Sequence, residues 1–235
     1  MRDQDDRTDF YAVLGLLAAK TGGPRALSEC HGRMGWPRRG VYYFFEPGEP
    51  RGAGADGLRV VRVGTHAVSS KSRTSLWQRL AQHRGTAAGT GNHRGSIFRL
   101  LVGEAIIHRG GLNLPSWGTA SSPGSAAKRL GLSREALKAL EAPLERKVGE
   151  VIGAMPLLWV EVDDEPGTES ARGFIERNSI ALLAGGAAVR PAGEWLGAWS
   201  RRQAVREGGL WNQNHVAETY DPSFIERFAE LVARM

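Results

Sequence analysis

Residues 41–46 have the sequence VYYFFE, and residues 58–63 have the sequence LRVVRV. Both segments are rich in β-branched and aromatic residues, which favour β-strands. The segment between them, residues 47–57, is rich in proline and glycine, as loops are. Two strands joined in this way predict an antiparallel hairpin. Because side chains alternate across a strand, Tyr42 and Tyr43 are expected on opposite faces of it.

Helical patterns surround this hairpin along the chain. Hydrophobic periodicity and capping residues predict helices over residues 8–20, 75–82, 96–105, 133–154 and 171–184, and Asp221-Pro222 is expected to open a last helix. Residues 157–162 (LLWVEV) are a third predicted strand, whereas residues 109–131 are expected to form a loop-rich insertion. This order predicts an α/β (α+β) fold with a small three-stranded sheet flanked by helices.

The same pattern suggests how the chain is divided. We expect an N-terminal helical extension over residues 1–35, a main domain over residues 36–215 and a C-terminal helix over residues 216–235 packed on that domain.

Composition excludes several classes of protein. The chain has 235 residues, of which 41% are hydrophobic and 24% are charged, as in ordinary globular proteins. Its single cysteine excludes an internal disulfide framework, and no Cys/His spacing is typical of a zinc site. No hydrophobic run approaches the roughly 20 residues that span a bilayer, and the acidic start is not typical of a signal peptide. We therefore expect a soluble, cytoplasmic protein without a membrane partner.

The positive charge of the chain is concentrated in one segment. The net charge is +6, but residues 59–109 hold nine Lys/Arg and one acid, which gives 9 − 1 = +8 and leaves −2 for the rest. Such a segment indicates a polyanion partner, because each neutralised phosphate releases counterions. Its alternative is a solvated basic surface without a ligand. The side chains that we expect to contact nucleic acid are Arg62, Lys71, Arg73, Arg84 and Arg94.

Five short motifs occur in a suggestive order. They are Gly40-Val41-Tyr42, then Arg62-Val63-Gly64, then Arg79 with His83 one helical turn later, then Glu176 within a predicted helix, and finally Asn212 after Trp211. In this order the motifs resemble those of the GIY-YIG nuclease superfamily, over roughly residues 36–215.

The resemblance implies a metal-dependent endonuclease that hydrolyses phosphodiester bonds, in DNA rather than RNA. Glu176 would bind Mg²⁺ or Mn²⁺, and Arg79 would contact phosphate oxygens. Tyr42, aided by His66 or His83, would orient or deprotonate the attacking water. Asn212 would hold Glu176 or the nucleic-acid backbone, with Asn214 as the alternative asparagine. The glycines Gly40 and Gly64 support the site, and paired cuts by a domain with one site would require a homodimer or successive nicks.

One departure from the family pattern leaves an alternative open. Arg62 stands where the second motif normally has tyrosine, so the hydrogen-bond network around the water would lack one member. The alternative is therefore a nucleic-acid-binding module with weak or no catalysis. Taken singly, the motif residues also have structural interpretations: Tyr42 as a half-buried strand aromatic, Arg79 and His83 as a solvated helix face, and Glu176 as a partner of Arg172 or Arg177. A third possibility is a small-molecule enzyme or scaffold in which the basic segment has no ligand.

Overall fold

The computed structural model describes residues 2–51, 57–67, 72–86, 88–167, 169–185 and 193–235. The helices and strands of these residues are α1 (Arg2–Thr21), β1 (Arg25–Ala26), β2 (Gly40–Pro50), β3 (Leu58–Gly64), α2 (Leu76–Arg84), α3 (Ile97–Gly110), α4 (Pro123–Leu130), α5 (Arg134–Gly153), β4 (Pro156–Glu161), α6 (Ala171–Leu183), α7 (Gln203–Gly208) and α8 (Ser223–Arg234).

The described strands form one antiparallel sheet with the order β1-β4-β2-β3. The predicted hairpin is present, and Tyr42 pairs with Gly64 of β3 on one side and with Trp159 of β4 on the other. A two-residue edge strand, β1, pairs with β4 and adds a fourth strand to the three that were predicted. The predicted mixed α/β fold is therefore confirmed.

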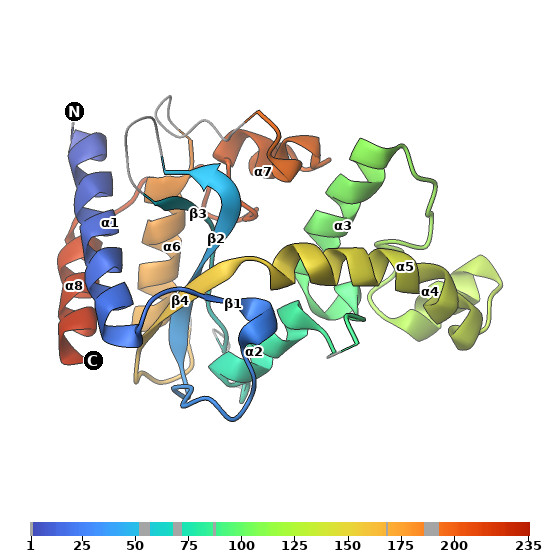
Figure 1. Cartoon of the computed structure of the whole chain (residues 1–235), viewed down its shortest axis with the longest axis horizontal. Coiled ribbons are helices and arrows are strands. Elements are labelled where there is room, and N and C mark those ends of the chain that lie inside the picture. Colours follow the sequence, from blue (N-terminus) through green and yellow to red (C-terminus); the bar gives the residue numbers. More distant parts are fainter. Residues whose placement is uncertain (1, 52–56, 68–71, 87, 168, 186–192) are drawn as a thin grey trace.

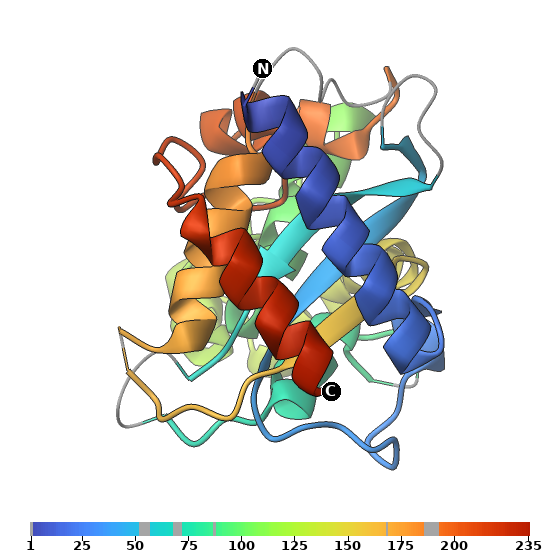
Figure 2. The ribbon, with the colours of Figure 1, turned by 90° about the vertical axis from the view of Figure 1, so that its left-hand side faces the viewer.

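Both faces of the sheet are covered by helices, which explains why β2 is a continuous hydrophobic run. The face that bears Tyr43 packs against α1, α6 and α8, and Phe10, Phe224 and Phe228 from the two ends of the chain meet there. These three helices lie together at the left of Figure 1, and Figure 2 shows α1 and α8 side by side in front of the sheet.

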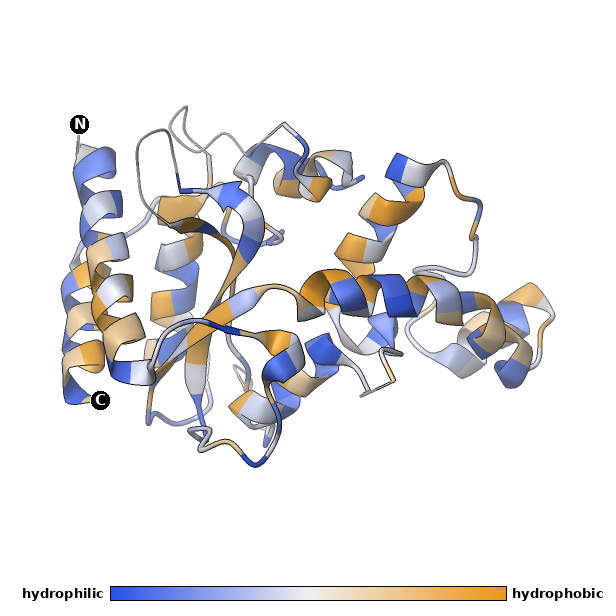
Figure 3. Ribbon diagram, in the orientation of Figure 1, coloured by the Kyte–Doolittle hydropathy of each residue, from blue (hydrophilic) through white to orange (hydrophobic). Residues whose placement is uncertain are grey.

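The opposite face of the sheet carries Tyr42 and Phe44, which pack against α2, α3 and α5. As predicted, Tyr42 and Tyr43 therefore lie on different sides of the strand. In Figure 3 the central strands are mostly hydrophobic, whereas the helices alternate hydrophobic and hydrophilic bands. The helices α3, α4 and α5 extend away from the sheet, at the right of Figure 1.

The largest difference from the sequence prediction lies in residues 109–131, which are not loop-rich throughout. They contain α4, which begins after the cap Ser122, has Pro123 in its first turn and ends at Gly131 with a left-handed φ of +65°. Eight residues are too few for a hydrophobic period to be recognised, although both capping signals are present. The helix α7 is shorter still, and β2 continues through residues 47–50 that were expected to be loop.

No helix within the described residues is both long enough and hydrophobic enough to cross a lipid bilayer.

Candidate active site

Tyr42 lies in the central strand β2, at the point where the sheet meets α2. Its side chain is 1% exposed, and its hydroxyl oxygen is 2.8 Å from His83 Nε2. The ring covers Gly64 of the neighbouring strand so closely that a Cβ at Gly64 would lie 2.3 Å from the Tyr42 hydroxyl oxygen. A Cβ at Gly40 would lie 2.4 Å from the carbonyl oxygen of Val160. Both glycines are therefore required by close packing around Tyr42 and its strand.

His83 connects Tyr42 to the N-terminus of α3. Its side chain is fully buried, and its Nδ1 lies 2.7 Å from the hydroxyl of Ser96, which caps α3 by accepting the Arg99 N–H. Burial, together with Arg79, Arg62 and Arg99, lowers the pKa of His83 well below its ordinary value. The imidazole is therefore neutral, and one of its two nitrogens accepts a hydrogen bond while the other donates one.

Arg62, the residue that departs from the family pattern, is buried directly beside Tyr42. Its guanidinium donates to the carbonyl oxygen of Trp211 and lies 4.9 Å from the ring centroid of Phe98, and it is close enough to Tyr42 for the two side chains to interact electrostatically. Because these groups cover the side chain, which is 6% exposed, the expectation that Arg62 contacts nucleic acid does not fit its position. It is instead a buried cation next to the tyrosine.

Glu176 projects from α6 to the end of β3. Its Oε1 accepts the backbone N–H of Thr65, the residue after Gly64, at 3.1 Å. Burial raises the pKa of Glu176, and the nearby Arg62, the Thr65 N–H and Arg79 oppose this rise. The side chain is half-buried.

Arg172, one turn before Glu176 on α6, holds the segment after β3 that contains Thr65 and His66. It is fully buried, forms an ion pair with Asp164, and donates to the carbonyl oxygen of His66. These contacts of Arg172 could not be predicted from the sequence, because a partner on its own helix, such as Glu176, is the nearer candidate. The consequence is that α6 fixes both the carboxylate and the loop that it contacts.

Arg79 is half-buried on α2, and its positive charge affects the pKa values of several nearby groups. It contributes to the pKa shifts of Arg62, His66, His83 and Glu176, so all of these groups lie around it. Its Nη1 donates to Gln82 Oε1 at 3.0 Å and to the Gly95 carbonyl oxygen at 3.4 Å. The structure thus brings together groups from β2, β3, α2 and α6 that are distant along the chain.

His66 lies at the edge of this group. Its Nε2 is 3.3 Å from the Arg38 carbonyl oxygen, which can only accept, so Nε2 carries the proton. Burial and the neighbouring Arg172 lower the pKa of His66 to about 4. The contact of Tyr42 is with His83, and of the two histidines considered from the sequence, His83 is the one in position to exchange a proton with the tyrosine.

Asn212 holds the backbone of β3. Its Oδ1 accepts the Val63 N–H at 3.1 Å, and its Nδ2 donates to the Val63 carbonyl oxygen at 2.9 Å. Val63 lies between Arg62 and Gly64, so Asn212 fixes the strand that carries both. The contact differs from the expected one with Glu176, while Asn214, the alternative, is exposed.

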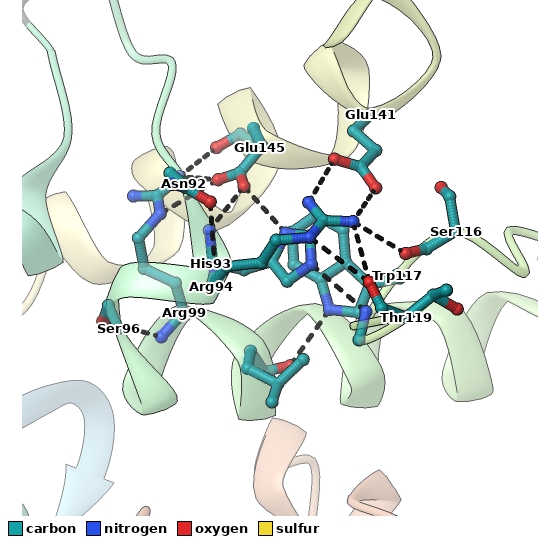
Figure 4. A network of polar contacts seen from close by, with 12 residues as sticks. Asn92, His93, Arg94, Ser96, Arg99, Ser116, Trp117, Thr119, Glu141 and Glu145 are labelled. Carbon is teal, nitrogen blue, oxygen red and sulfur yellow. Dashed lines mark hydrogen bonds and ion pairs between the residues drawn. The ribbon is translucent and has the colours of Figure 1, made fainter. Parts of the chain in front are cut away.

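The other basic residues expected to contact nucleic acid are divided between structural and exposed positions. Arg94 is a buried structural residue: its guanidinium makes two contacts with Glu141, at 2.7 and 2.8 Å, and its side chain is 3% exposed (Figure 4). Arg84 donates to the Cys30 carbonyl oxygen at 2.5 Å. Arg73 is exposed, and Lys71 lies outside the described residues.

The carboxylate of Glu176 fits a divalent metal ion. Within the described ranges, no three His, Cys, Asp or Glu side chains are grouped so that they could hold a metal by themselves. Mg²⁺, however, usually binds through one or two carboxylates and takes its remaining ligands from water and substrate phosphates. Among the described residues, only the Thr65 N–H is hydrogen-bonded to this carboxylate, through Oε1. Burial also penalises the charged carboxylate, and a bound cation would relieve that penalty.

Comparison with known proteins gives one match. The family model of the GIY-YIG domain matches residues 1–235 of the chain. No curated protein and no solved structure matches it significantly.

Proposed function

Because the chain belongs to the GIY-YIG domain family, whose members are nucleases that act on nucleic acid, we propose that it is a metal-dependent endonuclease that hydrolyses phosphodiester bonds in DNA. The observation that carries this proposal is the 2.8 Å contact between the Tyr42 hydroxyl and His83 Nε2, beside Arg79 and Glu176. Phosphodiester hydrolysis needs an activated water, charge relief at the phosphate and a stabilised leaving oxygen, and this group of residues offers each of them.

Tyr42 and His83 would act together on the attacking water. A phenol keeps its proton at neutral pH, so it becomes a useful base only if a second group takes that proton. The neutral His83 can do this through Nε2 while its Nδ1–H donates to the Ser96 hydroxyl. Burial and the nearby arginines lower its pKa and oppose this step, so the proton would stay on His83 only transiently. In this arrangement Tyr42 accepts the proton of the water as its own proton passes to His83. Ser96 would be a positioning residue, because its hydroxyl can accept the Nδ1–H in the tautomer that leaves Nε2 free to accept.

The two arginines would supply the positive charge. Arg79 is half-buried on α2, so its planar guanidinium can reach the non-bridging oxygens of a phosphate. Arg62 is a buried cation that interacts electrostatically with Tyr42, and it would stabilise negative charge that develops on the phenol oxygen during proton transfer. In this proposal Arg62 takes over part of the role of the missing tyrosine, and the departure from the family pattern does not by itself remove activity.

Divalent-metal dependence is typical of nucleases of this family, and Glu176 would hold Mg²⁺ or Mn²⁺ here. When bound, the ion would neutralise charge on the phosphate and stabilise the leaving oxygen. Asn212 would keep β3 in register next to Tyr42 through its two contacts with Val63.

Nicking of supercoiled plasmid DNA in Mg²⁺ tests the proposal. We expect the wild-type chain to cut, and Glu176→Gln to lower the rate at least about 100-fold, because a positioned group that stabilises the transition state is lost. The matched control is Glu230→Gln, which removes a carboxylate from an exposed position of α8, and it should cut at the wild-type rate. Binding of DNA without cleavage by the wild-type chain would instead favour the binding module. Equal rates for Glu176→Gln and the wild type would refute the assignment of Glu176.

A further inference from the structure

A large groove lies between the outer face of α2 and the helices α4 and α5, outside the group of residues assigned above. Its volume is about 1210 Å³. One wall is formed by α2, with Trp77, Gln78 and Gln82, and the other by α5, with Arg134 and Lys138. We call residues 123–142, which form the second wall, the helical arm.

The groove begins at the candidate active site. Arg79 Nη1 donates to the side chain of Gln82 and to the carbonyl oxygen of Gly95, and both of these residues line the groove. A phosphate bound by Arg79 would therefore lie at the mouth of the groove. Arg79 does not itself line the groove, but the next nucleotides on one side of that phosphate would enter it past Gln82 and Gly95.

The exposed charged side chains of the groove carry a net charge of 2 − 1 = +1, although three glutamates line it. Glu141 is paired with Arg94, and Glu145 is paired with Arg99 and accepts from His93, as Figure 4 shows. These ion pairs neutralise the two carboxylates. Among the described lining residues, the exposed charges that remain are Arg134 and Lys138, against Glu135. Arg134 and Lys138 are four residues apart on α5, so they lie on the same face of the helix.

The rest of the lining is uncharged and in large part apolar. It includes Trp77, Ala81, Pro123, Leu137 and Ala142. Duplex DNA presents phosphates along both strands and is bound mainly by rows of basic side chains. An unpaired strand also exposes its bases, and apolar and aromatic surfaces accept these together with a small number of phosphate contacts. Two cations and one carboxylate in a lining that is otherwise mostly uncharged therefore fit an unpaired strand better than a duplex.

The groove is formed before any ligand binds, because buried contacts fix its walls. Arg99 joins α3 to α5 through Glu145 and also donates to the carbonyl oxygen of His83 at the end of α2. Arg94 joins the loop before α3 to α5 through Glu141. The arm is thus fixed relative to the helix that carries Arg79 and His83.

We propose that this groove binds an unpaired strand of nucleic acid that continues from the phosphate at Arg79, with Arg134 and Lys138 contacting its backbone. The proposal rests on the nuclease function proposed above and narrows its substrate to nucleic acid with a single-stranded segment next to the cleavage position.

Binding measurements in EDTA test the groove without any cleavage. Fluorescence anisotropy would be recorded for the full chain with three labelled DNAs of one sequence: a blunt duplex and duplexes with a 5′ or a 3′ single-stranded extension. We expect Arg134→Glu/Lys138→Glu to weaken binding of one extended duplex by on the order of tenfold, and by more than it weakens binding of the blunt duplex. With Arg134→Ala/Lys138→Ala, the slope of log K against log salt should become shallower by about 1.4, since each contact with a single strand contributes about 0.7.

The matched control is Lys128→Glu/Arg129→Glu, which makes the same change of charge on exposed residues of α4 that do not line the groove. It should bind all three DNAs as the wild type does, and circular dichroism should show that all variants are folded. Equal losses for the blunt and the extended duplexes would overturn the proposal, because they would indicate general electrostatic attraction. Groove variants that bind all three DNAs with wild-type affinity would also overturn the groove proposal. If the wild-type chain nevertheless nicks plasmid DNA, the proposed nuclease function would stand without a role for the groove.

Discussion

At the scale of single residues, the close packing of Tyr42 on Gly64 restricts which residue types can occupy either position. The two residues pair across β2 and β3, and the tyrosine ring fills the space that any side chain at Gly64 would need. The two halves of the sequence signature, more than 20 residues apart, are therefore one structural unit. The glycine is required because the tyrosine must lie flat over the strand to reach His83.

Motif order predicted Tyr42, Arg79, His83 and Glu176 in one site. In the structure Tyr42 contacts His83, and the charge of Arg79 contributes to the pKa shifts of His83 and Glu176, while the catalytic roles stay predictions. The basic segment was less informative, because the number of arginines in a segment does not indicate which of them are buried. Within this segment Arg94 is paired with Glu141 and Arg99 with Glu145, and no local pattern connects these partners.

The pH dependence of stability is a prediction at this scale. Burial and Arg172, with further contributions from Arg79 and Arg39, lower the pKa of His66 to about 4, whereas the unfolded chain has an ordinary value of about 6.5. Between these values the unfolded chain binds a proton that the folded chain does not. The free energy of unfolding should therefore fall as the pH falls below about 6.5, by at most about 1.4 kcal/mol per pH unit for this residue. Urea unfolding at pH 7.5, 6.0 and 5.0 measures the slope.

The variant His66→Gln should show a shallower slope than the wild type over the same range. It should not abolish the slope, because His83 is also buried in its neutral form. An unchanged slope in His66→Gln would mean that the unfolded and folded chains bind protons equally at this position.

At the scale of elements, predicted helix ends agree with the structure where a cap and a hydrophobic period occur together. Ser75, Ser96 and Ser133 each cap the helix that was predicted to begin there. The helix α4 was missed because its capping residues are present without a recognisable period. The packing of α3 and the segment before it on α5 could not be predicted either. It depends on polar contacts and ion pairs between residues about 50 positions apart.

These ion pairs give a prediction about α3 and α5. Arg99→Ala should lower the free energy of unfolding by about 3–5 kcal/mol, because it leaves the carboxylate of Glu145 buried without its arginine partner. In the control Lys147→Ala, the lost pair with Glu150 is exposed on the same helix α5, and the loss should stay below about 1 kcal/mol. Urea denaturation of both variants gives the comparison. Similar losses in the two would mean that the buried pair contributes no more than a surface one.

At the scale of the whole molecule, the two ends of the chain complete one layer of the fold. The rings of Phe10 from α1 and Phe228 from α8 lie 5.6 Å apart, and both pack against Tyr43 of the central strand. The sequence indicated two terminal helices, but their packing on each other depends on contacts over more than 200 residues. The opposite face of that strand carries Tyr42, so α1 and α8 support the sheet directly behind the candidate active site.

If α8 is part of this core, Phe228→Ala should destabilise the whole chain rather than release one helix. We expect the free energy of unfolding to fall by about 3–5 kcal/mol, since a fully buried aromatic side chain would be replaced by a cavity. Leu16→Ala in α1 is the control, because Leu16 is 61% exposed and its loss should change stability by no more than about 0.5 kcal/mol. Urea unfolding followed by both tryptophan fluorescence and circular dichroism should give one transition in each variant. A separate early transition in Phe228→Ala, with the rest of the chain as stable as the wild type, would show that α8 only rests on a domain that is complete without it.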